Sequence, residues 1–162
     1  MATVAQMKIK IIEIGKTQKR ELQEMIDDYL KRVNHYCSLE IITLNLKLKT
    51  HDIDSIKESE GKLLIEYFAA VNPVNIFLLD EQGKEYSSLE FSSFIEKQTI
   101  SGKKEIYFVI GGAFGFSDKV KEFVKNKIAL SKMTFTHQMV RLLFAEQLYR
   151  VFTILKKEKY HH

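Results

Sequence analysis

One cysteine, one proline and no tryptophan occur among the 162 residues of the chain. A lone cysteine cannot form a disulfide within the chain, and it does not provide the cysteine spacing of a metal site. The sequence also lacks an apolar run of about eighteen residues and an apolar signal segment behind a basic start. These absences predict a cytoplasmic protein with no metal centre and no membrane partner.

Charge of one sign is in only slight excess. The 25 Lys and Arg residues against 21 Asp and Glu give a net charge of +4, which is mild for a protein that holds nucleic acid by electrostatics alone. This composition permits an RNA partner without requiring one, and we expect no DNA partner. Hydrophobic residues make up 45% of the chain, and no linker rich in Gly, Pro or Ser divides it, which predicts one globular domain over residues 1–162.

Hydrophobic periodicity predicts five strands that alternate with five helices. Such alternation is typical of an α/β domain with a largely parallel sheet. The segment "DEQGKEYSS", residues 80–88, is expected to be a loop that ends in a helix cap at Ser87 or Ser88. The expected strands are Met7–Ile14, Leu39–Leu46, Val74–Leu79, Glu105–Ile110 and residues 127–131. The expected helices are Lys19–Lys31, Asp52 or Asp54 to Val71, one around Phe91–Ile95, Ser117 or Asp118 to Lys125, and one from His137.

Three expected strand ends carry residues suited to a ligand, and ligands of open α/β sheets bind beyond the carboxyl ends of the strands. They are Leu79-Asp80 with the loop to Gly83, the glycine stretch Gly111–Gly115, and Ser131–Thr136. The glycine stretch can bring backbone N–H groups close to an anion or a base edge. It lacks the Lys-Ser/Thr of a P-loop, and a tight strand-to-helix turn is the alternative explanation. Asp80 is suited to accept a hydrogen bond from a ribose or a base, or simply to begin a turn.

His137 and Arg141 stand at positions i and i+4 at the start of the last helix, and this spacing directs two donors toward one place. Each residue alone has an ordinary explanation, as a cap or surface residue for His137 and as a carboxylate partner for Arg141. The pair predicts a binding or catalytic contribution more firmly than either residue alone.

The last helix is apolar over more than one side, so it must be buried on more than one side. We therefore predict a homodimer whose interface includes this helix, with Glu146 and Arg150 as an i,i+4 ion pair near its edge. The alternative is that two neighbouring elements of the same chain cover it. Its apolar residues include Val140, Leu142, Phe144, Ala145, Leu148, Tyr149, Val151, Phe152 and Leu155.

Four segments stand in a distinctive order: "IKIIEIGK" at the start, "LLDEQGKEYSS" in the middle, "FVIGGAFGF", and then "LSKMTFTHQMVRLLFAEQLYRVFTI" with a terminal "YHH". In this order the chain resembles the bacterial RlmH family of large-subunit ribosomal RNA methyltransferases. The resemblance runs from about Met7 to His161, and the last long segment is its most specific part.

The resemblance implies a single-domain SPOUT fold with a mostly parallel sheet of five to six strands between helices. It also implies a C-terminal part, approximately residues 74–155, that is threaded into a deep trefoil knot and binds S-adenosylmethionine in a homodimer. Unthreaded connections are the general rule, so the knot rests on the resemblance alone. The implied reaction is methylation of N3 of a pseudouridine in large-subunit ribosomal RNA, with the assembled ribosome as substrate.

Carried over by position, the resemblance implies cofactor contacts at the same three strand ends. These contacts are Leu79, Gly112, Ser131, Lys132, Met133, Thr134, Phe135 and Thr136. Methyl transfer needs no protein nucleophile, but the imide must lose its N3 proton, and nearby positive charge favours that anion. The expected catalytic residues are Arg141 in an electrostatic or phosphate-binding role, His137 or His161 in substrate binding or proton removal, and Tyr160 with His161 in a tail that reaches the partner's cofactor site.

Three departures from the family pattern stand out. Thr136 replaces a usual proline, although threonine can cap a helix. Ala113-Phe114 replaces a small residue followed by an acid or amide, and His162 replaces a basic residue at the end of the tail. Two other functions are compatible with the pattern: a SPOUT methyltransferase that acts on tRNA, and a non-enzymatic α/β dimer that binds a nucleotide or a protein.

Overall fold

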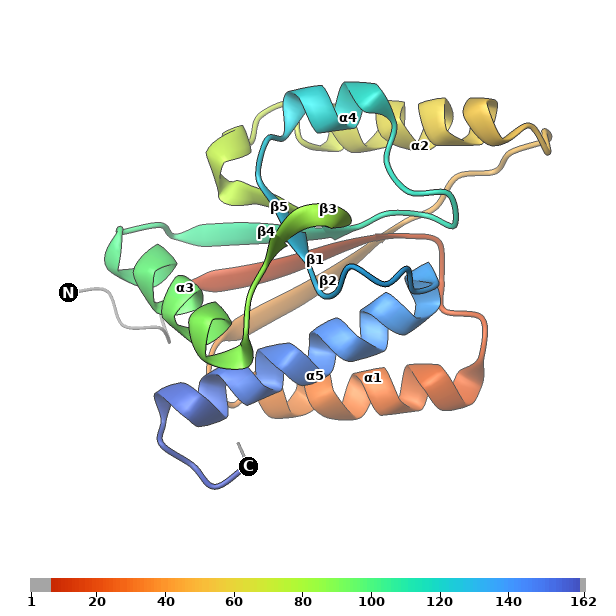
Figure 1. Cartoon of the computed structure of the whole chain (residues 1–162). Coiled ribbons are helices and arrows are strands. Elements are labelled where there is room, and N and C mark those ends of the chain that lie inside the picture. Colours follow the sequence, from red (N-terminus) through yellow and green to blue (C-terminus); the bar gives the residue numbers. More distant parts are fainter. Residues whose placement is uncertain (1–6, 161–162) are drawn as a thin grey trace.

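The computed structural model describes residues 7–160, and in this range five strands alternate with five α-helices as the sequence predicts (Figure 1). A short 3-10 turn, η2, follows the end of the second helix. None of the described helices is long and apolar enough to cross a membrane. The elements are β1 Lys8–Ile14, α1 Arg20–Val33, β2 Ser38–Leu44, α2 Ile53–Tyr67, η2 Pro73–Asn75, β3 Ile76–Glu85, α3 Ser88–Ile100, β4 Glu105–Ile110, α4 Asp118–Phe123, β5 Lys127–Ala129 and α5 His137–Leu155.

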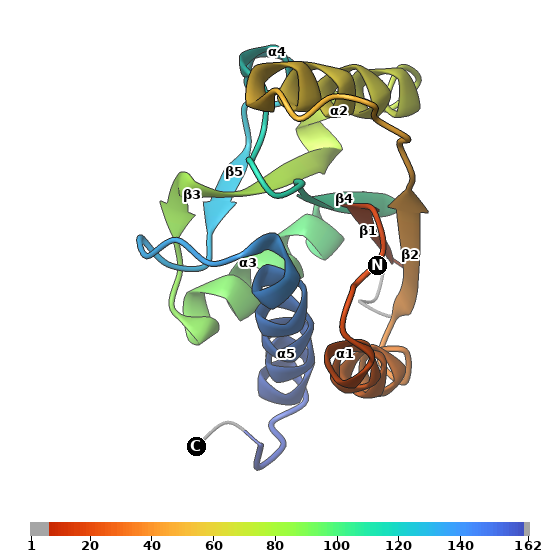
Figure 2. The ribbon, with the colours of Figure 1, turned by 90° about the vertical axis from the view of Figure 1, so that its right-hand side faces the viewer.

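The sheet has the strand order β2-β1-β4-β3-β5, and each of its pairings is parallel. Helices α1, α3 and α5 cover one face, while α2 and α4 cover the other (Figures 1 and 2). Alternate residues of each strand face opposite sides, so Ile9 and Ile11 of β1 belong to the core under α5, and Ile12 and Ile14 belong to the core under α2. The predicted α/β class with a largely parallel sheet is confirmed.

Strand β3 is longer than predicted, because the expected loop after Leu79 continues as strand to Glu85. Its pairing with β4 ends at Leu79, and its pairing with β5 resumes at Lys84 after a register shift. A Cβ at Gly83 would lie 2.5 Å from the backbone of Lys127, so this glycine lets β5 approach closely. The prediction of a loop was wrong because pairing with a distant strand, which local polarity does not reveal, fixes the conformation.

Side-chain caps settle the helix starts that the sequence left open. The side chains of Asp52, Ser87, Ser117 and Thr136 accept hydrogen bonds from the first turns of α2, α3, α4 and α5. Thr136 therefore begins α5 as a cap.

Helix α5 lies against the sheet between α1 and α3, as Figures 1 and 2 show. Phe144, Leu148 and Val151 are fully buried within the chain, and Phe144 packs on Phe108 with ring centroids 4.8 Å apart. Elements of the same chain thus cover most of the apolar surface, which was the alternative explanation, and that surface no longer requires a second subunit. The homodimer and the trefoil knot of residues 74–155 stay predictions.

Candidate functional site

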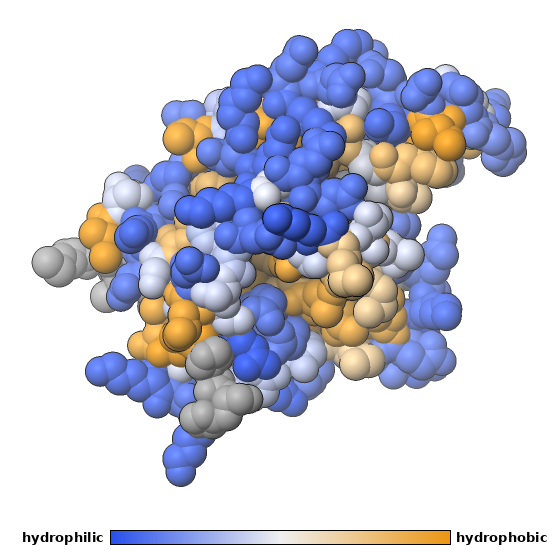
Figure 3. Space-filling view, viewed as in Figure 1, coloured by the Kyte–Doolittle hydropathy of each residue, from blue (hydrophilic) through white to orange (hydrophobic). Residues whose placement is uncertain are grey.

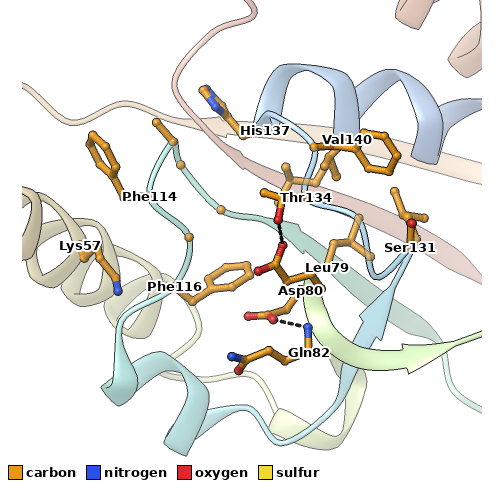
Figure 4. A pocket seen from close by; sticks show the side chains of 18 of the residues that line it. Lys57, Leu79, Asp80, Gln82, Phe114, Phe116, Ser131, Thr134, His137 and Val140 are labelled. Carbon is orange, nitrogen blue, oxygen red and sulfur yellow. Dashed lines mark hydrogen bonds between the residues drawn. The ribbon is translucent and has the colours of Figure 1, made fainter.

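A cleft of about 320 Å³ lies where β4 and β5 end, beside the irregular middle of β3 (Figure 4). Each of the three segments that the sequence singled out contributes to its lining: Leu79–Gln82 from the first, Gly111–Gly115 with Ile110 and Phe116 beside it, and Ser131 with Met133–Phe135 from the third. In Figure 3 apolar surface gathers in the hollow between the α2–α4 side of the molecule and the start of α5. The cleft therefore combines backbone from glycine-rich turns with an apolar lining.

The glycine stretch turns sharply after β4. The Gly115 N–H donates to the Gly112 carbonyl at 3.2 Å, and Gly115 has a φ of +77°, a conformation that side chains with Cβ disfavour. A Cβ at Gly112 would lie 2.4 Å from both carboxylate oxygens of Glu60. Glycine at this position thus lets a carboxylate of α2 lie directly against the backbone that borders the cleft.

Glu60 is a residue that the sequence reasoning missed. Its Oε2 atom is buried and has no hydrogen-bond partner among residues 7–160, and burial raises the pKa of this carboxyl group. Gly61 explains the placement, because a Cβ there would lie 2.2 Å from Ser117 Oγ. Glycine in the middle of a helix weakens it unless close packing requires it. Gly61 was therefore the available signal for this contact between α2 and the start of α4.

The loop from Ser131 to Thr136 joins β5 to α5 across the mouth of the cleft. Ser131 Oγ accepts the Met133 N–H at 3.0 Å, and Thr134 Oγ1 donates to Glu81 Oε2 of β3 at 2.5 Å (Figure 4). The loop is thus tied to β3, while Met133 is 74% exposed at its tip.

His137 stands at the start of α5 and lines the cleft. Desolvation by burial, and secondarily the positive charge of Arg141, lower the pKa of the imidazole below its ordinary value of 6.5. Its Nε2 lies 3.0 Å from Nε2 of Gln138. The ring is therefore neutral near neutral pH, which is the form that accepts a proton.

Arg141 does not line the cleft, although it lies one turn after His137. Its side chain is 1% exposed and donates to the Ile14 carbonyl at 2.7 Å and to Thr17 Oγ1 at 3.1 Å. Its Nε lies 3.4 Å from Glu13 Oε2 of β1. The guanidinium therefore fastens the first turns of α5 to the end of β1, and the carboxylate partner that the sequence offered as the ordinary explanation is present.

Asp80 begins a turn, which is one of the two explanations that the sequence left open, and its contact with a ribose or a base stays a prediction. Its Oδ1 accepts the Gln82 N–H at 2.8 Å, as in an Asx turn, and its Oδ2 lies 3.5 Å from Lys121 Nζ. The carboxylate borders the cleft while it shapes the bulge of β3.

Most of the predicted cofactor residues line the cleft, and two do not. Lys132 points to Glu85 at 3.9 Å and is largely exposed, and Thr136 serves as the cap of α5. The predicted residues that line the cleft are Leu79, Gly112, Ser131, Met133, Thr134 and Phe135.

The tail residue Tyr160 lies at the other end of α5. Its ring contacts Tyr149 with centroids 4.7 Å apart, and its hydroxyl lies 3.4 Å from the hydroxyl of Tyr29. The tail folds back along α5, because the Tyr160 hydroxyl also lies 3.4 Å from Glu146 Oε1. Glu146 and Tyr149 follow the cleft residue His137 by about 14 and 18 Å of helix, so Tyr160 does not line the cleft of its own chain. His161, also predicted to be catalytic, lies outside the described residues.

The class of this protein follows from its similarity to known proteins. A putative methyltransferase from Legionella pneumophila, solved in complex with the bound cofactor SAM, superimposes with a TM-score of 0.50 at 11% sequence identity, over 88% of this chain and 66% of that chain. Residues 7–161 also match the family model described as predicted SPOUT methyltransferase. At 11% identity the solved structure shows only that the fold is similar. The match to the family model shows that the chain is a SPOUT methyltransferase.

Relatives over nearly the full length define the family more closely. Proteins named ribosomal RNA large subunit methyltransferase H are 50% identical in Flavobacterium psychrophilum, 49% in Christiangramia forsetii and 43% in Porphyromonas gingivalis, each over 96% of this chain and 99% of the relative. The chain therefore belongs to the SPOUT methyltransferase family, and the predicted resemblance to its RlmH members is confirmed.

Proposed function

We propose that the chain is a large-subunit ribosomal RNA methyltransferase that uses S-adenosylmethionine. The observation that carries this proposal is the near full-length match to relatives that share this activity in their names. The cleft supports it, because the same three strand ends that the sequence singled out converge there.

The residues of the cleft fit the cofactor. Apolar side chains of Leu79, Ile110 and Val140 lie beside the backbone of the glycine stretch and the hydroxyls of Ser131 and Thr134. This donor set suits a ligand with an apolar-faced adenine and polar edges, and the volume of about 320 Å³ lies within the range of small-molecule sites. When bound, S-adenosylmethionine supplies an electrophilic methyl group. If calorimetric titration shows no binding of S-adenosylmethionine to the protein, this part of the proposal is overturned and a non-enzymatic α/β dimer is favoured.

His137 is the proposed proton acceptor from the substrate imide. It is the titratable side chain of the cleft whose neutral form is favoured by burial, and a general base must lie within hydrogen-bond reach of the proton that it removes. Arg141 then acts as a positioning residue, because its contacts with Ile14, Thr17 and Glu13 hold the start of α5 against β1. An alternative, direct role of Arg141 at a phosphate requires that it leave these buried partners.

N3 of a pseudouridine on the assembled ribosome is the proposed target. A small domain with a net charge of +4 has little surface for sequence readout, which favours recognition by shape within a preassembled particle. Mass mapping of ribosomal RNA from cells with and without the protein tests the position. Intact ribosomes, naked ribosomal RNA and a tRNA pool offered side by side test the substrate. Efficient transfer to naked RNA or to tRNA contradicts the proposal.

A homodimer is part of the proposal, because Tyr160 packs beside Glu146 and Tyr149, about 14–18 Å of helix beyond His137 of its own cleft. Two subunits would allow Tyr160 and His161 of one chain to complete the cleft of the other. Sedimentation measures the oligomeric state. Mixed dimers of a His137→Ala chain and a chain truncated before Tyr160 test the exchange, since restored activity requires one complete composite site.

A further inference from the structure

Phe114 and Lys57 border the cleft but belong to no assigned contact. Phe114 projects from the glycine stretch and is 43% exposed, and Lys57 reaches the cleft from α2. Figure 4 shows both on one side of the cleft, opposite Leu79 and Ser131, which belong to the proposed cofactor contacts. One side of the cleft is thus unassigned.

Lys57 carries a positive charge that is free for a ligand. Two other lysines near the cleft are engaged, Lys121 with Asp80 at 3.5 Å and Lys132 with Glu85 at 3.9 Å. Within residues 7–160, Lys57 forms no ion pair with a carboxylate. An ammonium group without a carboxylate partner beside a cleft favours an anion there.

Phe114 presents an aromatic face from a firmly held turn. The hydrogen bond between Gly115 and Gly112 closes this turn, and the positive φ of Gly115 fixes its shape. An aromatic ring left in water forgoes the free energy of its burial, so its exposure beside a cleft suggests an apolar or aromatic partner.

A methyltransferase must hold two substrates in one cleft. The proposed proton acceptor His137 lines this cleft and lies toward the Phe114 side in Figure 4. Since the target base must come within hydrogen-bond reach of the acceptor, the unassigned side is where the nucleotide belongs. A base that leaves its stack for an enzyme is commonly held against an aromatic side chain.

We propose that Phe114 stacks on a base of the RNA substrate at the cleft and that Lys57 binds a neighbouring phosphate. This inference rests on the proposed function. It assigns the β5–α5 loop and the backbone at Gly112 to the methyl donor, and the side chains of Phe114 and Lys57 to RNA.

Phe114→Ala tests the stacking. We expect a decrease of about tenfold in kcat/KM with ribosomes and a matching loss of ribosome binding in a filter assay, because one stacked base contributes at about this level. The dissociation constant for S-adenosylmethionine, measured by calorimetry, should not change. Phe114→Tyr should retain activity, because it keeps the aromatic face.

Lys57→Ala tests the phosphate contact, with Lys62→Ala on the same helix as the matched control. Lys62 lies one and a half turns further along α2 and is exposed beside Glu66. Loss of one phosphate contact lowers the slope of log binding constant against log salt by about 1. Lys57→Ala should show this lower slope with unchanged cofactor affinity, and Lys62→Ala should match the wild type.

Three outcomes overturn the assignment. Weaker binding of S-adenosylmethionine to Phe114→Ala would move the ring to the cofactor, and a changed sedimentation coefficient would move it to a subunit interface. Unchanged ribosome binding in both variants would remove the RNA contact. Failure of the wild type to transfer a methyl group, with ribosome binding still sensitive to both variants, would instead reject the proposed function and keep the RNA surface.

Discussion

Polar side chains are less completely paired near the cleft end of α5 than near its tail end. Near the cleft end, Glu60 Oε2 of α2 is buried without a hydrogen-bond partner in the described part of the chain, and Arg141 Nε has only the ion pair with Glu13 at 3.4 Å. At the tail end, Arg150 donates to Glu146 at 2.5 Å, and Tyr160 packs under the Arg150 guanidinium. A buried carboxylate without a partner costs free energy, so Glu60 beside the cleft is a group that stability alone does not favour. A site that binds a ligand is where such groups are expected.

We expect the largest difference when the loss in free energy of unfolding of Arg141→Ala is compared with that of Arg150→Ala. Removing Arg141 leaves Glu13 and the Ile14 carbonyl beside an empty space, and loss of one partner of a buried ion pair costs about 3–5 kcal/mol. Removing Arg150 breaks a partly exposed i,i+4 pair worth less than about 1 kcal/mol. Urea unfolding of both variants measures the difference. Equal losses would show that burial of Arg141 does not distinguish the two ends.

This expectation also changes how activity data must be interpreted. Loss of methylation in Arg141→Ala would report a fold defect unless the variant is shown to be folded. Arg141→Lys with a folded baseline is the better probe, because it keeps the charge but not the fork of donors that reaches Ile14 and Thr17.

Gly83→Ala is expected to damage the cleft end by a smaller amount. The added Cβ would meet the backbone of Lys127 and Ile128 at 2.5 and 2.6 Å, and backbone atoms cannot swing away as a side chain can. Overpacking of this kind costs about 1–3 kcal/mol, and the shifted β5 should also weaken binding of S-adenosylmethionine. Thermal unfolding and calorimetry measure both effects. Lys84→Ala, an exposed change at the next position of β3, is the control and should leave both nearly unchanged.

Local sequence signals predicted the element order well, because strands such as β4 and helices such as α1 carry their own periodicity. They also located the cleft, since the ends of β4 and β5 meet at one edge of a parallel sheet, beside Leu79, where the sequence predicted the end of β3. What they missed depends on contacts between distant segments. The second half of β3 becomes strand only because β5 pairs with it, and Glu60 borders the glycine stretch only because Gly61 lets α2 approach Ser117.

The sequence also did not reveal that His137 lines the cleft while Arg141 does not, because this difference again depends on contacts between distant segments. Helical spacing of i and i+4 places both residues on one side of α5, but it does not say which neighbour each side chain meets. Arg141 forms an ion pair with Glu13, which faces α5 because alternate residues of β1 do so. The histidine stands a turn earlier, where the sheet ends and the cleft begins.

Glu60→Gln is expected to change stability the least, and to raise the melting temperature where the other substitutions lower it. Burial raises the pKa of the Glu60 carboxyl above its ordinary value of 4.5, so the folded state favours the neutral form. The wild type therefore loses stability as the pH rises from 4.5 through this raised pKa, whereas an amide does not titrate. The variant should match the wild type near pH 4 and melt a few degrees higher near pH 7.5, because 1 kcal/mol shifts the melting temperature by about 2–4 °C at this size.

Thermal unfolding of both proteins across this pH range measures the effect. Glu158→Gln at the tail end is the matched control, because Glu158 accepts a hydrogen bond from Tyr36 at 2.7 Å and is exposed. Because this carboxylate already has a hydrogen-bond partner, Glu158→Gln should not raise the melting temperature at any pH. A lower melting temperature for Glu60→Gln near pH 7.5 would mean that the carboxylate is stabilised by a partner in solution, and the contrast between an unsatisfied cleft end and a satisfied tail end would then fail at Glu60.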